Sequence, residues 1–109
     1  AIGSGTVASA AVLVLLSAPK ERRFMTRYAD LFLHQGDTGL HGGRYTKNTL
    51  DNAAKAMAWD NDKYAKIIAR ETGLSVKRVK EMMEKETIIR PAEAKQLGFV
   101  HDILPSRRR

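Results

Sequence analysis

The chain has 109 residues, of which 43% are hydrophobic and 28% charged, and its formal net charge is +7. This length and balance predict one domain, or a piece of one, with a globular core and a charged surface. The absence of cysteine excludes disulfides, thiolate metal sites and cysteine nucleophiles.

The first predicted elements are a strand end and an apolar helix. Residues 1–5, "AIGSG", are typical of a strand end and a tight turn, because their glycines permit unusual backbone angles. Residues 9–18 predict a helix that is apolar nearly all round, hence buried on most sides, and Pro19 ends it. The apolar run over residues 7–18 is shorter than the roughly 20 residues that span a bilayer. No basic segment precedes it as in a signal peptide, so we expect a buried helix.

Two short strands and a glycine-rich loop are predicted next. Residues 22–25 and 31–35 read as strands on either side of a turn. The continuous apolar run at residues 31–33 favours a strand covered on both faces. Residues 36–45 carry four glycines, which indicates a loop or a flexible hairpin.

The rest of the chain is predicted to be mostly helical. Thr46 or Asn48 caps a long helix that continues to about Glu71, and Gly73 closes it. Ser75 caps a second helix.

A third short helix and a last strand complete the order. Residues 91–97 begin with proline and are followed by glycine, as helices often are. Residues 99–104 predict a strand, and the basic tail at 105–109 is expected to be disordered. This alternation predicts an α/β layered fold over residues 1–104. The small sheet and the initial Ala suggest a piece of a larger domain.

Ser9 is the first candidate for chemistry. At a helix start, free N–H groups and the helix dipole stabilise developing negative charge, and small neighbours allow a peptide to approach. The alternative is a serine that simply caps the helix, as many do.

The histidines and carboxylates supply further candidates. His34 ends an apolar strand, where α/β folds often place functional groups; the alternative is a partly buried histidine without a catalytic role. His41 and His101 show no metal-ligand spacing with it. Spacing alone selects no acid from the carboxylates of residues 81–86.

Three segments carry a family resemblance. "GTVAS" (5–9), "KERRFMTRYADLFLHQ" (20–35) and "ETGLSVKRVKEMMEKETIIRPAEAKQLGFVHDIL" (71–104) resemble, in order and spacing, the proteolytic subunit of the Clp protease, the ClpP family of serine peptidases. The resemblance implies a ClpP/crotonase-like layered fold, here lacking its N-terminal strands and helices.

The resemblance also implies roles for particular residues. Ser9 corresponds to the nucleophile, His34 to the general base, and Glu86 to the acid that orients His34. The Ala10 backbone N–H corresponds to one donor of the oxyanion hole, and the helix after Thr46 to the "handle" by which rings pack. No metal or other cofactor is implied.

The sequence departs from the family pattern at three points. Glu86 is one methylene longer than the usual aspartate, and Gly36 replaces the proline that follows His-Gln. The family's first half, which completes the oxyanion hole, has no counterpart in this chain.

The partners implied are further copies in rings, an AAA+ unfoldase and unfolded polypeptides, with the missing half encoded upstream or supplied by a separate subunit. The compartment implied is the cytoplasm or an organelle matrix or stroma. No membrane partner is expected. Two rival functions are a catalytically inactive structural subunit, favoured by Glu86, and a basic module that binds nucleic acid or a scaffold, favoured only by the net charge.

Overall fold

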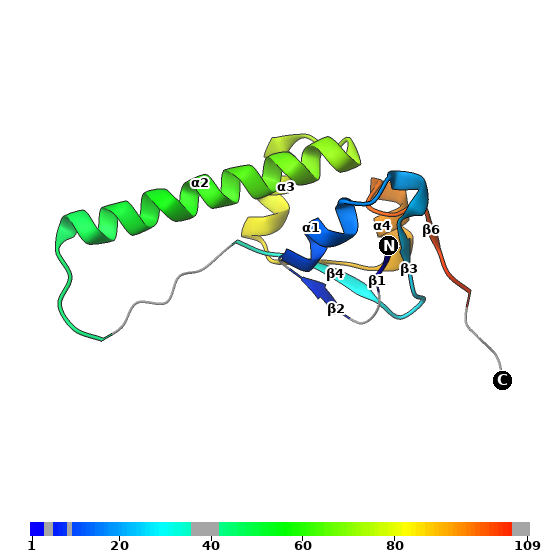
Figure 1. Cartoon of the computed structure of the whole chain (residues 1–109), viewed down its shortest axis with the longest axis horizontal. Helices are drawn as coiled ribbons and strands as arrows, with labels where there is room; N and C mark the ends of the chain where they lie inside the picture. Colours follow the sequence, from blue (N-terminus) through cyan, green and yellow to red (C-terminus); the bar gives the residue numbers. More distant parts are fainter. Residues whose placement is uncertain (4–5, 9, 36–41, 106–109) are drawn as a thin grey trace.

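A computed structural model describes residues 1–3, 6–8, 10–35 and 42–105. One end of the molecule is an α/β body, from which a long helix projects, and the overall extents are 58 × 31 × 22 Å (Figure 1). The predicted α/β class is confirmed.

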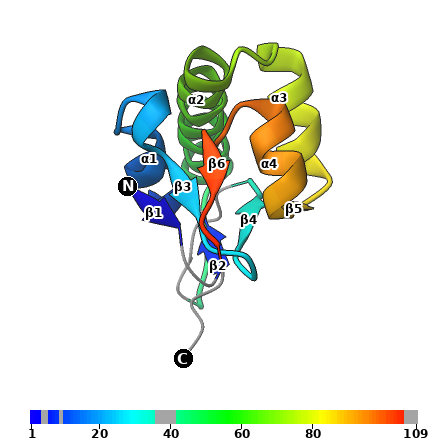
Figure 2. The same cartoon turned by 90° about the vertical axis from the view of Figure 1, so that its right-hand side faces the viewer.

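The described strands form two small sheets that lie beside the helices (Figure 2). The first sheet is parallel and has the order β1 (Ile2–Gly3), β3 (Phe24–Met25), β6 (Asp102–Ile103). The second has the order β2 (Thr6–Ala8), β4 (Asp30–Leu33), β5 (Thr87–Ile89). There β2 is parallel to β4, whereas β5 is antiparallel to it.

Several strand predictions need correction. β2 and β5 are not predicted as strands from the sequence, because each is three residues long and is defined by pairing with a distant segment. The predicted strand at 22–25 is only β3, since Lys20–Arg22 form a 3₁₀ helix. The strand predicted at 31–35 ends at Leu33, and the one at 99–104 is only β6.

Strand β4 is also less enclosed than expected. Leu31 and Leu33 are fully buried, whereas Asp30 and Phe32, which precede them in turn, are half-buried. The burial therefore alternates with the pleat, as in a strand with one face on the core.

Helix α1 (Ala10–Leu16) is shorter and less buried than predicted. Val12, Leu15 and Leu16 enter the core, but Val14 is 68% exposed. Only one side of α1 is covered, by α2 and β2, so the expectation of burial on most sides is wrong.

The other helices begin and end close to their predicted bounds. α2 (Lys47–Thr72) starts after Thr46, whose Oγ1 accepts from the Thr49 N–H at 3.1 Å, and it ends at left-handed Gly73. α3 (Val76–Glu84) starts after Ser75, whose Oγ accepts from the Arg78 N–H. α4 (Pro91–Leu97) runs from proline to left-handed Gly98.

The core lies where α1, the C-terminal half of α2, α3 and α4 meet the sheets. It is formed by Val7, Val12, Leu15, Leu16, Met25, Ala29, Leu31, Leu33, Ala65, Ile68, Ala69, Val79, Met83, Ile89, Ala94, Phe99 and Val100. No residue of the N-terminal half of α2 is buried, which agrees with its projection from the body.

Arg23 is the buried charged residue of this core, at 1% exposure. Its guanidinium donates to the carbonyls of Ala18 (2.8 Å), Glu71 (3.0 Å) and Leu16 (3.0 Å), and pairs with the Glu71 carboxylate at 2.6 Å. Arg23 therefore ties the C-terminal ends of α1 and α2 to β3, and it satisfies carbonyls that helix ends leave without partners.

Candidate active site

The pairing of β4 with β5 positions two of the predicted catalytic residues. Leu33 lies opposite Thr87 in the antiparallel register. His34 follows Leu33 and Glu86 precedes Thr87, so each is next in the chain to the last pair of the β4–β5 ladder.

The His34 ring is oriented by its immediate neighbours. It stacks on Phe32, with ring centroids 4.9 Å apart and an interplanar angle of 28°. Its Nδ1 lies 2.8 Å from the Gln35 carbonyl oxygen. Because a carbonyl only accepts, Nδ1 donates and Nε2 carries the lone pair of the neutral ring. A lone pair on Nε2 is what a general base at that atom requires.

Glu86 occupies the turn between α3 and β5. Its φ is +53°, in the left-handed region, and its N–H donates to the Met83 carbonyl at 3.1 Å. A residue other than glycine in this region costs of order 1 kcal/mol, and such strain is concentrated at functional sites. The Glu86 side chain is exposed.

The expected contact between the Glu86 carboxylate and Nδ1 of His34 is not formed in this conformation. Nδ1 bonds to the Gln35 carbonyl instead. Sequence reasoning missed this partner, because a backbone oxygen of the next residue leaves no side-chain pattern to detect.

Ser9, Gly36 and His41 lie outside the described residues, so the role of Ser9 stays a prediction. The described segments on either side of Ser9 are informative. β2 ends at Ala8, which pairs with Phe32, and α1 begins at Ala10. The strand next to β4 is therefore followed closely in the chain by α1.

The remaining histidine with described coordinates has a different environment. His101 is exposed, meets the ring of Phe24 edge-on at 6.1 Å, and donates its backbone N–H to the Arg23 carbonyl. In the part of the chain that the structure describes, no three His, Asp or Glu residues are grouped so that they could hold a metal ion.

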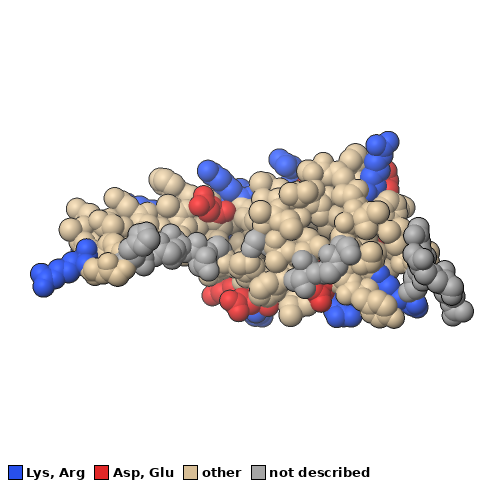
Figure 3. Space-filling model, turned by 60° about the horizontal axis from the view of Figure 1, so that its bottom comes forward, with Lys and Arg blue, Asp and Glu red and all other residues tan. Residues whose placement is uncertain are grey.

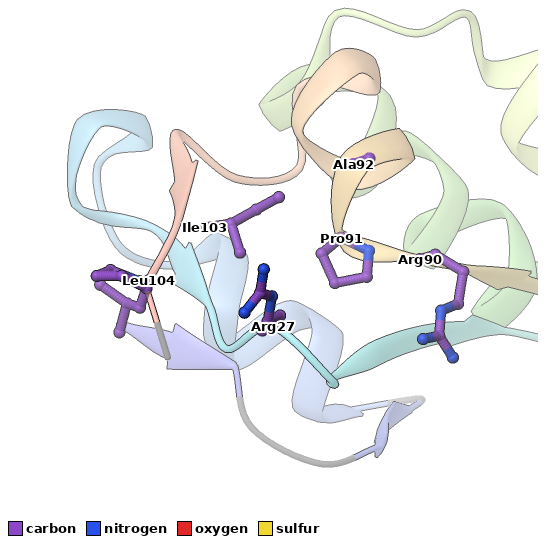
Figure 4. A pocket seen from close by; sticks show the side chains of 7 residues that line it. Arg27, Arg90, Pro91, Ala92, Ile103 and Leu104 are labelled. Atoms are coloured by element: carbon purple, nitrogen blue, oxygen red, sulfur yellow. The ribbon is translucent and has the colours of Figure 1, made fainter. Parts of the chain in front are cut away.

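A hollow of about 610 Å³ lies at the opposite end of the β4–β5 pair (Figure 4). It is lined by Arg27, Arg90, Pro91, Ala92, Ile103, Leu104 and Pro105. Arg90 forms an ion pair with Asp30, the first residue of β4, at 3.6 Å. Since His34 follows the last residue of β4, this hollow is separate from the candidate catalytic residues.

The surface charges are mixed in sign. On the face shown in Figure 3, Lys and Arg side chains lie apart from one another, with acidic groups between them. Within the described segments, no helix is long and apolar enough to cross a membrane.

Comparison with known proteins identifies the family. Residues 1–107 match the family model described as Clp protease. The chain belongs to the Clp protease family. This confirms the resemblance inferred from the sequence, and the family's proteolytic subunits are peptidases.

The relatives agree with this assignment. The chain is 33% identical to the ATP-dependent Clp protease proteolytic subunit 2 of Treponema denticola, over 98% of this chain and 52% of that protein. It is 30% identical to proteolytic subunit 3 of Rhizobium etli, over 97% of this chain and 53% of that protein. The chain therefore spans about half the length of the curated relatives it matches.

A solved structure confirms the fold. A point mutant of ClpP1 from Listeria monocytogenes superposes with a TM-score of 0.83 at 26% sequence identity. The match covers 97% of this chain and 56% of that one. The ClpP-like layered fold predicted from the sequence is confirmed for this part of the structure.

Proposed function

We propose that the chain is a serine-type endopeptidase subunit that cleaves unfolded polypeptides by acyl transfer inside an oligomeric chamber. The observation that carries the proposal is the β4–β5 register, in which Leu33 and Thr87, the chain neighbours of His34 and Glu86, form a pair, while β4 also pairs with β2. Membership of a peptidase family supports it.

Each residue has a defined step in the proposed reaction. The Ser9 hydroxyl attacks the peptide carbonyl, and Nε2 of His34 takes its proton and then delivers it to the leaving amine. The Ala10 N–H stabilises the oxyanion. Water, activated by His34, hydrolyses the acyl-enzyme and frees Ser9. Glu86 stabilises the imidazolium once Nδ1 exchanges its bond to Gln35 for the carboxylate.

Labelling with a fluorophosphonate probe tests the nucleophile. We expect labelling of the wild type, none of Ser9→Ala, and strongly reduced labelling of His34→Ala. The control is Ser17→Ala, which removes an exposed serine at the other end of α1 and is expected to label normally. An assembled oligomer that fails to label overturns the proposal.

The role of Glu86 has its own test. Glu86→Gln keeps the size of the side chain and removes the charge, so we expect labelling to slow more than tenfold if the carboxylate orients His34, on the order of such losses in other triads. Glu81→Gln, an exposed change on α3, is the matched control. Equal rates assign the orientation of His34 to the Gln35 carbonyl alone.

A catalytically inactive structural subunit is the second candidate. The bond between Nδ1 and the Gln35 carbonyl favours it, because it occupies the atom that the acid would orient. An assembled ring without fluorophosphonate labelling would support this function. The basic binding module requires salt-sensitive binding to DNA or RNA, and the absence of such binding would exclude it.

The partners belong to the same proposal. We propose rings of further copies, delivery of long substrates by an AAA+ unfoldase, and a second oxyanion donor from residues beyond this chain or from a separate subunit. The proposed compartment is the cytoplasm or an organelle matrix or stroma.

A further inference from the structure

Phe32 lies on the side of the second sheet that faces away from the core. In the register it pairs with Ala8 of β2 and with Ile88 of β5. The neighbouring row, with Leu31 at its centre, is buried, so the pleat turns the row of Phe32 to the other side. Ile88 is 59% exposed and Phe32 is half-buried. The Phe32 ring therefore lies outside the packed core.

The Phe32 ring contacts His34 instead. Phe32 is two residues before His34, the spacing that places side chains on one side of an extended chain, and the two rings stack. We propose that Phe32 is a positioning residue, which holds the His34 imidazole in the orientation where Nδ1 donates to the Gln35 carbonyl and Nε2 keeps its lone pair. The inference deepens the peptidase function proposed above, on which its effect on catalysis rests.

The separation and tilt of the two rings are those of a favourable aromatic pair. Aromatic rings attract one another at centroid distances of about 4.5–7 Å, in offset or edge-on arrangements. The Phe32 and His34 centroids are 4.9 Å apart and the planes differ by 28°, so this pair is close to the short end of that range. Such a pair favours the stacked orientation about two- to tenfold.

The hydrogen bond at Nδ1 does not fix the imidazole by itself. The bond from His34 to the Gln35 carbonyl is solvent-exposed, so water competes for both of its atoms. It also restrains a single atom, about which the ring can still turn. A contact over the face of the ring restrains its plane. The hydrogen bond and the stack together therefore determine where Nε2 points.

The stack also becomes stronger when His34 takes a proton. The face of a phenyl ring is negative and attracts a cation within about 6 Å of its centroid, a condition that the 4.9 Å separation meets. An interaction that strengthens during proton transfer lowers the barrier, whereas one of constant strength does not. Phe32 thus stabilises the imidazolium in a conformation where Nδ1 is bonded to the Gln35 carbonyl rather than to the Glu86 carboxylate.

The tautomer of His34 tests the positioning without requiring turnover. The full chain is labelled with nitrogen-15 in histidine alone. Magic-angle-spinning NMR at about pH 9, where histidine is neutral, then reports which ring nitrogen carries the proton, and His34→Gln identifies the signals. We expect a protonated Nδ1 in the wild type and in Phe32→Tyr, which keeps an aromatic face. Phe32→Leu and Phe32→Met have no such face and are expected to give a mixture of tautomers.

A second aromatic pair provides the matched control. Phe24 meets the His101 ring edge-on, at 6.1 Å and 88°, so Phe24→Leu also removes a half-buried phenyl ring and is expected to leave the His34 signals unchanged. We expect the fluorophosphonate probe to label Phe32→Leu about three- to tenfold more slowly than the wild type. Phe32→Tyr and Phe24→Leu are expected to label within about twofold of it. Circular dichroism checks the fold of each variant.

Three results overturn the inference: folded Phe32→Leu and Phe32→Met keep the wild-type tautomer, Phe32→Tyr loses it as they do, or Phe32→Leu labels as fast as a wild type that labels. Failure of the peptidase function is distinguishable, because it abolishes fluorophosphonate labelling of the wild type while the tautomer of His34 still depends on Phe32.

Discussion

At the residue scale, the Arg23 side chain connects β3 to the C-terminal ends of α1 and α2. Its guanidinium reaches three carbonyls and a carboxylate at the ends of α1 and α2. Nothing in the local sequence indicates this burial, because "KERR" has the composition of a surface turn. Only the convergence of two helix ends makes a buried arginine favourable there.

Replacement of Arg23 is expected to destabilise the fold strongly. Arg23→Met fills similar space but leaves buried carbonyls without donors, which costs about 3 kcal/mol of unfolding free energy. Urea denaturation followed by circular dichroism measures it. Arg22→Met, at the exposed neighbouring position, is the control and is expected to change stability little. Similar midpoints for both variants would show that water replaces the guanidinium.

Asp62 contributes to the decrease in the free energy of unfolding at low pH. Hydrogen bonds from Lys66 and Lys80 lower the pKa of Asp62 from 3.8 to about 2. A depressed pKa in the folded state means that this stabilisation is complete above pH 4 and is lost as the pH falls from about 4 towards 2.

Asp62→Asn is therefore expected to lose less stability than the wild type between pH 4 and pH 2. Thermal unfolding at closely spaced pH values measures the difference. Added salt should reduce it, since the pairs are at the surface. Parallel curves for the two proteins would contradict the assignment. Glu71 and Asp102 also have lowered pKa values, so both proteins still lose stability in acid.

At the scale of elements, the ends of α2, α3 and α4 were predictable, the strands β3, β4 and β6 were predicted too long or displaced, and β2 and β5 were not predicted. Thr46, Ser75, Gly73, Pro91 and Gly98 act locally, so they indicate helix ends from the sequence alone. β2 and β5 exist because distant segments pair with them, and their residues carry little local information.

The candidate site divides in the same way. Ser9 and His34 were candidates from the sequence alone, and the resemblance to a family assigned their roles and added Glu86. The β4–β5 pairing ends at Leu33 and Thr87, the chain neighbours of His34 and Glu86. The bond from His34 to the carbonyl of the next residue, Gln35, leaves no side-chain pattern by which the sequence could predict it.

The two glycines that end α2 and α4 differ in what surrounds them. Both have positive φ, but a Cβ on Gly98 would lie 2.6 Å from the Thr72 carbonyl oxygen, whereas a Cβ on Gly73 would meet nothing within 4 Å. The close approach at Gly98 lets α4 pack against the end of α2.

We therefore expect Gly98→Ala to destabilise the protein clearly more than Gly73→Ala. The Gly73 change costs about 1 kcal/mol from backbone strain alone, and the Gly98 change adds displacement of α4. Chemical denaturation of both variants gives the comparison. Equal losses would mean that α4 shifts without cost.

At the scale of the whole molecule, the projecting part of α2 carries two exposed large apolar side chains, on opposite sides of the helix. Leu50 is 45% exposed and Trp59 is 67% exposed. We expect the proposed packing of rings to bury them.

The double change Leu50→Glu and Trp59→Glu is expected to weaken self-association at least tenfold, because tryptophan is a frequent energetic centre of interfaces. Sedimentation velocity over a concentration series measures it. The control combines Asn52→Glu and Ala56→Glu, which add the same charge at exposed positions of α2. An unchanged oligomer in the first variant would place the interface elsewhere.

The pairing of Leu33 with Thr87 also determines how this architecture tolerates changes of length. Residues 34–86 connect β4 to β5, the strand that pairs with it, so the whole connection is closed by one pair of strands. The entropic cost of closing such a connection depends only weakly on its length, about 0.6 kcal/mol for each doubling. Added or deleted turns of α2 would therefore alter how far this helix projects while leaving the β4–β5 pairing in place.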